Sequence, residues 1–439
     1  MSTENPYGKN GSGQKQQVSQ ARTGALHALQ NYRLKSILPE TINCDREDDS
    51  RLAERIFFGV LQNERFLDHC LSGFLQTSKT HPRVMDLLRM SAYQIMFLDR
   101  VPDSAAVNDA VMICRASRQS FACGMVNAVL RKISAEKTKL FQANLDPSVR
   151  YSHPDWLVLQ MMQEHDEAFT RSWLEGNQSV PELCLQINTR LISLEAYLDL
   201  LHKKQVQPLS VREDFPSVRI PACRVDTLPG YREGLFYVQD DAARASIHCI
   251  GLQPGMRVLD ACAAPGGKSM AAVLDGAEVL SCDINSSRLK RCRENYERLG
   301  FKIETRVMDA VEFCYEFEGE FDAVIADVPC SGTGVIRRHP EIRRRTYTEV
   351  RELLPLQRAI LCNLSRYVRR GGILLYSTCS VLREEDEAQV NVFLETHPDF
   401  SAVPICSDGF DCSNGMLRSW THQNGNDGFF AAKMVRKHD

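Results

Sequence analysis

The sequence predicts a multidomain chain: an all-α bundle over residues 22–150, linker helices and a small α+β module over 151–245, and an α/β doubly wound domain over 246–439. Three observations predict it. Apolar residues recur every three or four positions in the first part, short β-like runs flank a helical stretch in the second, and strands alternate with helices in the third. The polar residues 1–21 predict a disordered lead-in.

The composition is typical of a soluble globular protein, with 43% hydrophobic and 25% charged residues. The formal net charge of -3 provides no bulk attraction to nucleic acid, so any RNA contact depends on local basic patches. The chain has neither a long apolar run nor a signal peptide, which predicts a cytoplasmic protein without a membrane segment. Its 16 cysteines include no C-x-x-C pair, so we expect mostly buried free thiols and no metal site.

The helical bundle is predicted from amphipathic patterns with apolar residues at three- and four-residue spacing. These patterns cover residues 51–71, 83–98, 101–117 and 121–133. A bundle without chemistry of its own would account for the same periodicity.

A hinge containing proline, "YSHPDW" at residues 151–156, separates this bundle from the α+β module. The module combines β-like runs near residues 181–190 and 211–225 with a helix-like stretch at 194–204.

The doubly wound domain is predicted from strands separated by helical stretches such as residues 286–299. The strands are expected at residues 256–260, 277–283, 303–309, 321–329, 372–380 and near 428–437. Four strand ends carry Asp260, Asp283, Asp309 and Asp327. Helix capping explains one or two of these acids, whereas a ligand site at the carboxyl ends of the strands explains all four.

The turn "LDACAAPGGKS", residues 259–269, brings the backbone close to a ligand. It is not a phosphate-binding P-loop, because Cys262 stands where that motif requires glycine, and it lacks the G-x-G-x-x-G of dinucleotide sites. The remaining common nucleoside ligand is S-adenosylmethionine. Asp283 is placed to bind its ribose, and Asp309 to receive the adenine amino group or a nearby water.

Two thiols follow neighbouring strands, Cys330 in "ADVPCSGTG" and Cys379 in "YSTCS". With no aromatic residue in the first turn to stack a base, they suggest carbon rather than nitrogen methylation. A thiolate that adds to C6 of a pyrimidine turns C5 into a nucleophile, and it can leave afterwards. Such a thiol needs nearby positive charge or donors to lower its pKa. Asp327 is placed to contact N3 and the exocyclic amine, and spacing alone does not rank the two thiols.

The segments "DACAAPGGKS", "DVPCSGTGVIRRHPE" and "YSTCSVLREEDE" resemble the Sun-type (Fmu) RNA cytosine-C5 methyltransferases. The helical part with "MVNAVLRKI" resembles the NusB antitermination factor, and together the resemblance covers Arg22 to Lys437. It implies a Rossmann-like methyltransferase domain that uses S-adenosylmethionine and a NusB-like RNA-binding domain. The implied product is 5-methylcytosine in 16S rRNA, at the equivalent of cytosine 967, on free RNA or an early assembly intermediate. We expect a monomer.

The resemblance also implies residue roles. Cys379 would be the nucleophile, and Cys330 would assist proton removal or product release. Asp283 would lie on the ribose and Asp309 near adenine, with Asp327 near the reacting centre. The remaining cofactor contacts would be Cys262, Ala263, Ala264, Pro265, Gly266, Gly267 and Lys268.

Basic residues suited to RNA phosphates follow Cys330: Arg337, Arg338, Arg343, Arg344 and Arg345. A solvated charged face is the alternative interpretation. In the NusB-like domain the candidates are Arg22, Arg131 and Lys132, for which core or surface roles are equally consistent with the sequence.

Other functions remain open at this point. The same chemistry on tRNA or 23S rRNA is one, and a non-catalytic RNA-binding or antitermination factor is another. A dinucleotide-dependent oxidoreductase is disfavoured by the missing glycine fingerprint.

Overall fold

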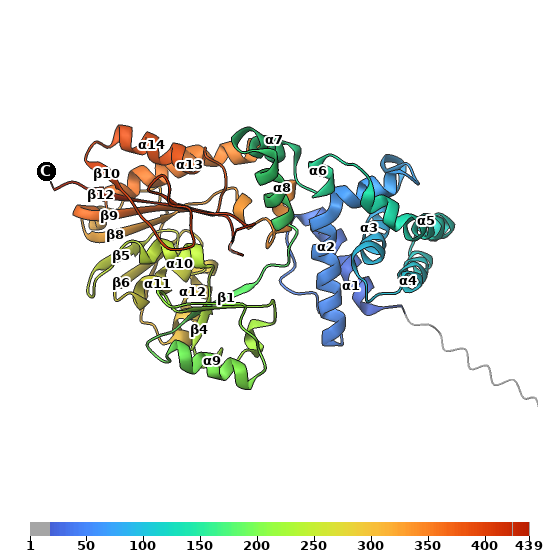
Figure 1. The fold of residues 1–439 in the computed structure, drawn as a ribbon, viewed down its shortest axis with the longest axis horizontal. Helices are drawn as coiled ribbons and strands as arrows, with labels where there is room; N and C mark the ends of the chain where they lie inside the picture. The colour runs from blue at the N-terminus through green and yellow to red at the C-terminus, as the bar shows by residue number, and fades with distance from the viewer. Residues whose placement is uncertain (1–17, 424, 439) are drawn as a thin grey trace, which may run out of the picture. The chain divides into compact units, whose positions relative to one another are not determined.

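The computed structural model describes residues 18–423 and 425–438, and the chain divides into two compact units, Met1–Ser152 and His153–Asp439 (Figure 1). The predicted lead-in lies outside the described residues up to residue 17, and the first helix begins at Gln20, inside the predicted lead-in. Within the described ranges, no helix is long and apolar enough to cross a membrane.

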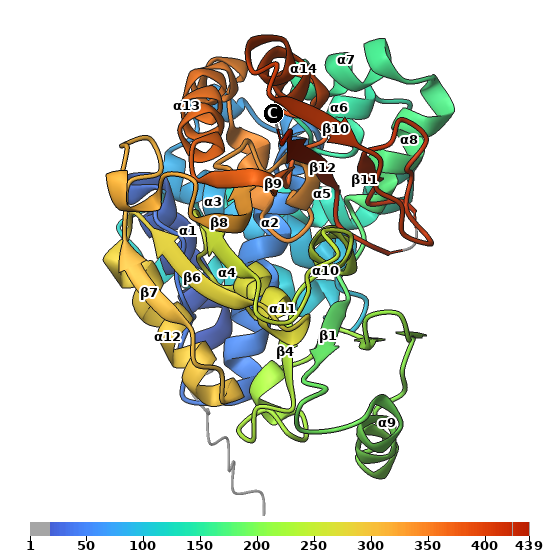
Figure 2. The ribbon, with the colours of Figure 1, turned by 90° about the vertical axis from the view of Figure 1, so that its left-hand side faces the viewer.

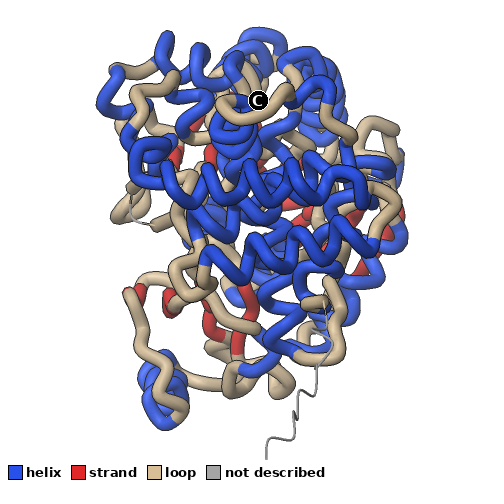
Figure 3. Tube along the Cα trace, turned by 90° about the vertical axis from the view of Figure 1, so that its right-hand side faces the viewer, coloured by secondary structure: helices blue, strands red, loops and turns tan. Residues whose placement is uncertain are grey.

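The first unit is helical, as predicted, and Figure 3 shows its helices joined by loops. Its helices are α1 (Gln20–Lys35), α2 (Glu47–Ser72), α3 (Pro82–Phe97), α4 (Asp103–Ala116), α5 (Cys123–Gln142) and the single turn α6 (Pro147–Arg150). Helix α3 starts where Pro82 occupies the first turn and the His81 side chain accepts a hydrogen bond from the backbone of Arg83.

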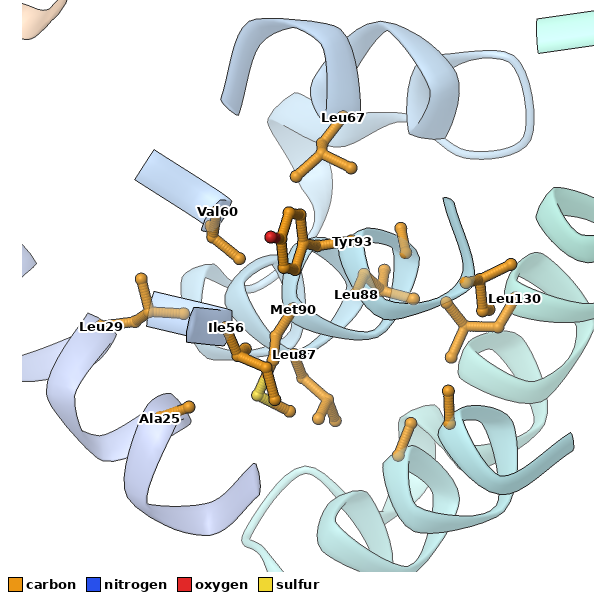
Figure 4. Packing of buried hydrophobic residues seen from close by; sticks show 14 of the residues in the cluster. Ala25, Leu29, Ile56, Val60, Leu67, Leu87, Leu88, Met90, Tyr93 and Leu130 are labelled. Carbon is orange, nitrogen blue, oxygen red and sulfur yellow. The ribbon is translucent and has the colours of Figure 1, made fainter. Parts of the chain in front are cut away.

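The core of this unit is built from the apolar faces of its helices (Figure 4). Ile56 and Val60 lie one turn apart on α2 and are fully buried, as the i, i+4 spacing predicts. Helices α2 and α3 approach closely at Gly59, where an added Cβ would lie 2.0 Å from the Tyr93 ring. Glycine is therefore needed at this crossing.

The second unit begins with α7 (Asp155–Glu164) and α8 (Glu167–Gly176), followed by the small α+β module. The module is an antiparallel sheet in the order β2-β3-β1-β4 with one helix. Its elements are β1 (Leu183–Ile187), α9 (Leu194–Lys203), β2 (Ser210–Arg212), β3 (Ser217–Ile220) and β4 (Phe236–Val238).

An eight-stranded sheet forms the centre of the second unit (Figure 2). Its order is β10-β12-β9-β8-β5-β6-β7, with β11 paired to β12. The strands are β5 (Arg257–Asp260), β6 (Glu278–Asp283), β7 (Glu304–Val307), β8 (Phe321–Asp327), β9 (Val368–Thr378), β10 (Phe400–Val403), β11 (Leu417–Ser419) and β12 (Phe429–Arg436). Strands β5 to β9 are parallel, whereas β12 is antiparallel to β9. The six predicted strands are present, and β10 and β11 are additional.

Helices cover both faces of this sheet, so its strands bury both sides. Val258 of β5 packs with one group of helices and its neighbour Leu259 with the other. The first group is α10 (Asp241–His248), α11 (Gly267–Leu274) and α12 (Ser286–Leu299), and the second is α13 (Tyr347–Ser365) and α14 (Glu387–Thr396).

The order of the strands indicates where on the sheet a ligand binds. The chain runs outward from β5 to β6 and β7, then returns to β8 and β9 on the other side of β5. The direction of winding therefore reverses between β5 and β8, and open α/β sheets bind ligands beyond the strand ends at such a point.

All 16 cysteines are free thiols. The expectation that most are buried is wrong: five are buried and the other eleven are partly or fully exposed. Among the described residues, no group of three or more His, Cys, Asp and Glu side chains could hold a metal ion.

Candidate active site at the strand ends

The glycine turn after β5 packs closely against neighbouring side chains. Gly266 has a φ of 102°, a left-handed conformation that favours glycine. An added Cβ at Gly266 would lie 2.7 Å from the Tyr296 hydroxyl oxygen, and one at Gly267 would lie 2.9 Å from the amide nitrogen of Gln239. The turn thus requires Gly266, whereas the contact at Gly267 is with the end of the Gln239 side chain, which no sequence motif indicated.

Asp283 lies beside this turn at the end of β6, where it is 3% exposed. Its Oδ2 accepts a hydrogen bond from the backbone N of Ala264 (3.3 Å), and its Oδ1 accepts one from the backbone N of Asn285 (2.9 Å). The structure therefore brings Asp283 to the predicted cofactor segment. Asp309 follows β7 and is exposed, and its Oδ1 accepts a hydrogen bond from the backbone N of Val311.

Asp260 is fully buried at the base of the turn, at the end of β5. Its Oδ2 accepts a hydrogen bond from the Ser269 hydroxyl (2.7 Å), which contacts Ser281 (2.5 Å), and Ser281 contacts the Tyr296 hydroxyl (3.0 Å). Oδ1 has no hydrogen-bond partner in the described part of the chain. Burial raises the pKa of Asp260 to about 7.

Asp260 makes the stability of its unit depend on pH. The unfolded carboxyl ionises near 3.8, whereas the folded-state pKa is about 7. Because the folded state binds the proton more tightly between these values, ionisation opposes folding increasingly as the pH rises towards 7. We expect the neutral variant Asp260→Asn to gain about 2 kcal/mol of unfolding free energy relative to wild type between about pH 5 and pH 8. Urea unfolding at several pH values measures this, and a difference that does not change with pH would contradict it.

Lys268 and Asp327 form an ion pair between the glycine turn and the end of β8. The Lys268 Nζ lies 2.7 Å from Asp327 Oδ2, and the Ser377 hydroxyl donates to Asp327 Oδ1 at 2.8 Å. The ammonium also lies over the Phe429 ring, 5.1 Å from its centroid. Asp327 is therefore fixed in position, and one oxygen faces a positive charge.

The two thiols meet at the ends of the adjacent strands β8 and β9. Their Sγ atoms are 3.1 Å apart, and both residues are half-buried. The hydrogen bond to Cys379, together with burial, raises the pKa of Cys330 well above its usual range. The raised pKa favours the protonated thiol at Cys330, and either sulfur can donate in the contact between the two thiols.

Hydroxyl groups tie the two thiol loops together. The Ser380 hydroxyl lies 3.3 Å from that of Ser331 and 3.2 Å from that of Thr333. The backbone N of Ser331 donates to Glu385 Oε1 at 2.8 Å, and the backbone N of Gly334 donates to the carbonyl oxygen of Cys379 at 2.9 Å. The sequence places these residues next to the thiols, but it carries no signal for the cross-links between the loops.

Two of the five predicted RNA-binding arginines are internal, which corrects that prediction for them. Arg337 Nε donates to Asp427 Oδ1 (2.9 Å), and Arg343 Nη2 donates to the carbonyl oxygen of Asn177 (2.9 Å). Both side chains are buried, and burial lowers the pKa of Arg343 to about 9. Neighbouring residues of the 3₁₀ turn Pro340–Arg344 point in different directions, so a run of arginines does not form a single face.

The other three arginines of this stretch remain accessible: Arg338 and Arg345 are half-buried, and Arg344 is exposed. In the first unit, Arg22 belongs to the interior, where its Nη1 lies 2.6 Å from Asp109. Arg131 and Lys132 are exposed.

Comparison with known proteins agrees with this architecture. The NusB family matches residues 19–135, the ferredoxin-like domain of RsmF/B-like methyltransferases matches 153–214, and the 16S rRNA methyltransferase RsmB/F family matches 248–435. The crystal structure of PH0851 has the same fold, with a TM-score of 0.78, 23% identity, and coverage of 95% of this chain and 98% of that chain.

Two curated relatives match over nearly their whole length. The ribosomal RNA small subunit methyltransferase B of Yersinia pestis is 32% identical over 419 residues, and that of Pectobacterium carotovorum is 33% identical over 417 residues. Each alignment covers 93% of this chain and 95% of the relative. The chain therefore belongs to the RsmB/F family of 16S rRNA methyltransferases.

Proposed function

We propose that this protein methylates C5 of one cytosine in 16S rRNA, at the equivalent of cytosine 967, acting as a cytoplasmic monomer on free RNA or an early assembly intermediate. Cys379 is the nucleophile in this proposal. The observation that carries it is the thiol pair, with its Sγ atoms 3.1 Å apart at adjacent strand ends beside the glycine turn. Its position is where a doubly wound sheet binds ligands.

The turn fits S-adenosylmethionine, the cofactor of this family. Gly266 and Gly267 carry no side chain at the turn, and the buried Asp260 Oδ1 lacks a donor that an amino group would supply. Residues 262–268 and Asp283 would hold the cofactor, with Asp309 towards the adenine. When bound, the cofactor supplies a methyl group on a positively charged sulfur.

We expect Asp283→Asn to weaken S-adenosylmethionine binding by roughly 10-fold, because a ribose diol loses a charged acceptor worth about 1.4 kcal/mol. Isothermal titration of the cofactor into each protein measures the Kd. Asp309→Asn is the comparison: its carboxylate is exposed, so we expect a smaller loss. An unchanged Kd for Asp283→Asn would remove this residue from the cofactor site.

The two thiols have different roles in the proposed reaction. The Cys379 thiolate adds to C6 of the unstacked cytosine, and the resulting enamine makes C5 nucleophilic. Asp327, held by Lys268 and Ser377, contacts N3 and the exocyclic amine. After methylation, loss of the C5 proton and elimination of the Cys379 thiolate restore the ring.

Cys330 takes part in a proton transfer in the proposed reaction. Its raised pKa depends first on the hydrogen bond to Cys379. In the proposed adduct the Cys379 sulfur is bonded to C6, which alters the contact that contributes most to the raised pKa of Cys330. This supports Cys330 as the group that assists removal of the C5 proton.

The test is methyl transfer from labelled S-adenosylmethionine to unmodified 16S rRNA, supplied free or in early assembly particles. Bisulfite sequencing then maps the product. We expect one protected cytosine at the equivalent of position 967. Transfer to tRNA or 23S rRNA but not to 16S rRNA would reassign the substrate, and transfer to a nitrogen would overturn the carbon chemistry.

A further inference from the structure

One residue connects the thiol loop to an accessible aromatic side chain. Arg345 Nη1 donates a hydrogen bond to the carbonyl oxygen of Cys330 at 3.3 Å. The carbonyl oxygen of the same arginine accepts one from Trp156 Nε1 at 2.9 Å. Trp156 is thus connected through Arg345 to the backbone of Cys330, although it lies 189 residues earlier in the chain than Arg345.

Trp156 lies next to a second aromatic ring at the start of α13. Its ring centroid is 5.6 Å from that of Tyr347, and the two planes are tilted by 34°. Trp156 is half-buried, Tyr347 is 37% exposed, and the Tyr347 hydroxyl donates to Glu384 Oε2 at 3.1 Å. The rings are therefore anchored by their polar atoms while part of their apolar surface faces solvent.

The other two tryptophans of the chain differ from Trp156. Trp173 is fully buried and Trp420 is 4% exposed, so both belong to the interior. Burial in the interior does not account for Trp156, which is partly exposed beside Tyr347. Arg351, one turn into α13, is exposed and acts electrostatically on Tyr347, and exposed Arg344 precedes Tyr347 by three residues in the chain.

We propose that Trp156 and Tyr347 form a stacking platform for an unpaired RNA base that neighbours the target cytosine, with Arg344 contacting the adjoining phosphate. The chemistry is that of single-strand recognition, in which aromatic rings stack on bases and nearby cations follow the backbone. The inference rests on the proposed function, because it requires an RNA whose target cytosine leaves its stack beside Cys330.

The experiment uses the fluorescence of Trp156 and needs no methyl transfer. A 16S rRNA fragment containing the target cytosine is titrated into the full-length protein. We expect stacking to quench Trp156, and the quenching to disappear in Trp156→Phe but persist in Trp420→Phe. An abasic nucleotide on the stacked side of the target is expected to abolish the quenching, whereas one on the other side leaves it intact.

Affinity separates stacking from a purely structural role. Trp156→Phe keeps an aromatic ring but loses the bond to Arg345, whereas Trp156→Ala loses both. We expect Trp156→Ala and Tyr347→Ala to raise the Kd for RNA by roughly 10-fold. Trp156→Phe and Tyr347→Phe should stay within about 3-fold of wild type, and the cofactor Kd should not change. If Trp156→Phe binds RNA as poorly as Trp156→Ala, the residue only positions Arg345.

The two proposals fail in different ways. Quenching that depends on the flanking base, without any 5-methylcytosine, would keep the platform and overturn the proposed reaction. Normal methylation with neither quenching nor a change in RNA affinity in the alanine variants would overturn the platform alone.

Discussion

Replacing Cys379 by alanine is expected to abolish methyl transfer, by roughly 10⁴-fold or more, because Cys379 is the proposed nucleophile that forms the bond to C6. Replacing Cys330 by alanine is expected to do something different. Addition and methylation proceed, but removal of the proton and release slow, so the protein accumulates as a covalent adduct with RNA. The asymmetry follows from the proposed roles, with Cys379 as nucleophile and Cys330, whose pKa the hydrogen bond to Cys379 and burial raise well above its usual range, as the group that handles the proton.

Denaturing gels of the protein with labelled RNA measure the adduct, and filter binding of the methylated RNA measures turnover. Cys362→Ala is the matched control. Its thiol is exposed on α13 and contacts His397, so we expect full activity and no adduct. An adduct in Cys379→Ala and none in Cys330→Ala would reverse the two roles. Cofactor binding should be unchanged in both variants, which separates loss of the nucleophile from loss of the fold.

Gly334→Ala is expected to destabilise the second unit by about 3 kcal/mol and to reduce kcat more than that loss of folded protein explains. An added Cβ would lie 2.1 Å from the carbonyl oxygen of Gly428. Neither backbone can move freely, because Gly428 donates to the carbonyl oxygen of Gly334 at 2.8 Å and Gly334 donates to that of Cys379 at 2.9 Å. Relief of the clash therefore displaces the Cys379 loop from Cys330.

Urea unfolding and single-turnover methylation measure the two effects of this variant. Gly300→Ala is the comparison within the same unit. That glycine ends α12 with a φ of 72° and has open space around it, so we expect a cost of about 1 kcal/mol and an unchanged kcat. Equal effects of the two substitutions on stability and kcat would show that the contact at Gly428 does not position the thiol loop.

Local sequence patterns predicted the helices and strands well where the spacing of apolar residues was regular. The helix expected over residues 286–299 is α12, Ser286–Leu299, and the strands next to the glycine turn and the thiols are present. The short strands β10 and β11 carried no comparable signal. The antiparallel direction of β12 was not predicted either, since a buried strand has the same apolar pattern in both directions.

Some of the site residues could be predicted from the sequence, and others could not. Asp283, Asp327 and the thiols were expected to lie together because the carboxyl ends of parallel strands meet at one edge, and the structure brings them there. Gln239 was not expected at the glycine turn, nor Trp156 beside Arg345, since both lie in segments before β5. Their places depend on how the module and α7 pack, which no local spacing encodes.

The sequence by itself determined the order of helices and strands, the glycine turn and the residue types at the strand ends. These follow from side-chain period, backbone freedom and the rule that parallel strands end at one edge. Only the tertiary structure decided which arginines face solvent and how closely the two thiols approach each other. Arg337 is internal because Asp427, 90 residues away, meets it, and folding brings the Sγ atoms of Cys330 and Cys379 to within 3.1 Å of each other. Charge state and exposure depend on partners brought together by folding, so they are properties of the packed molecule.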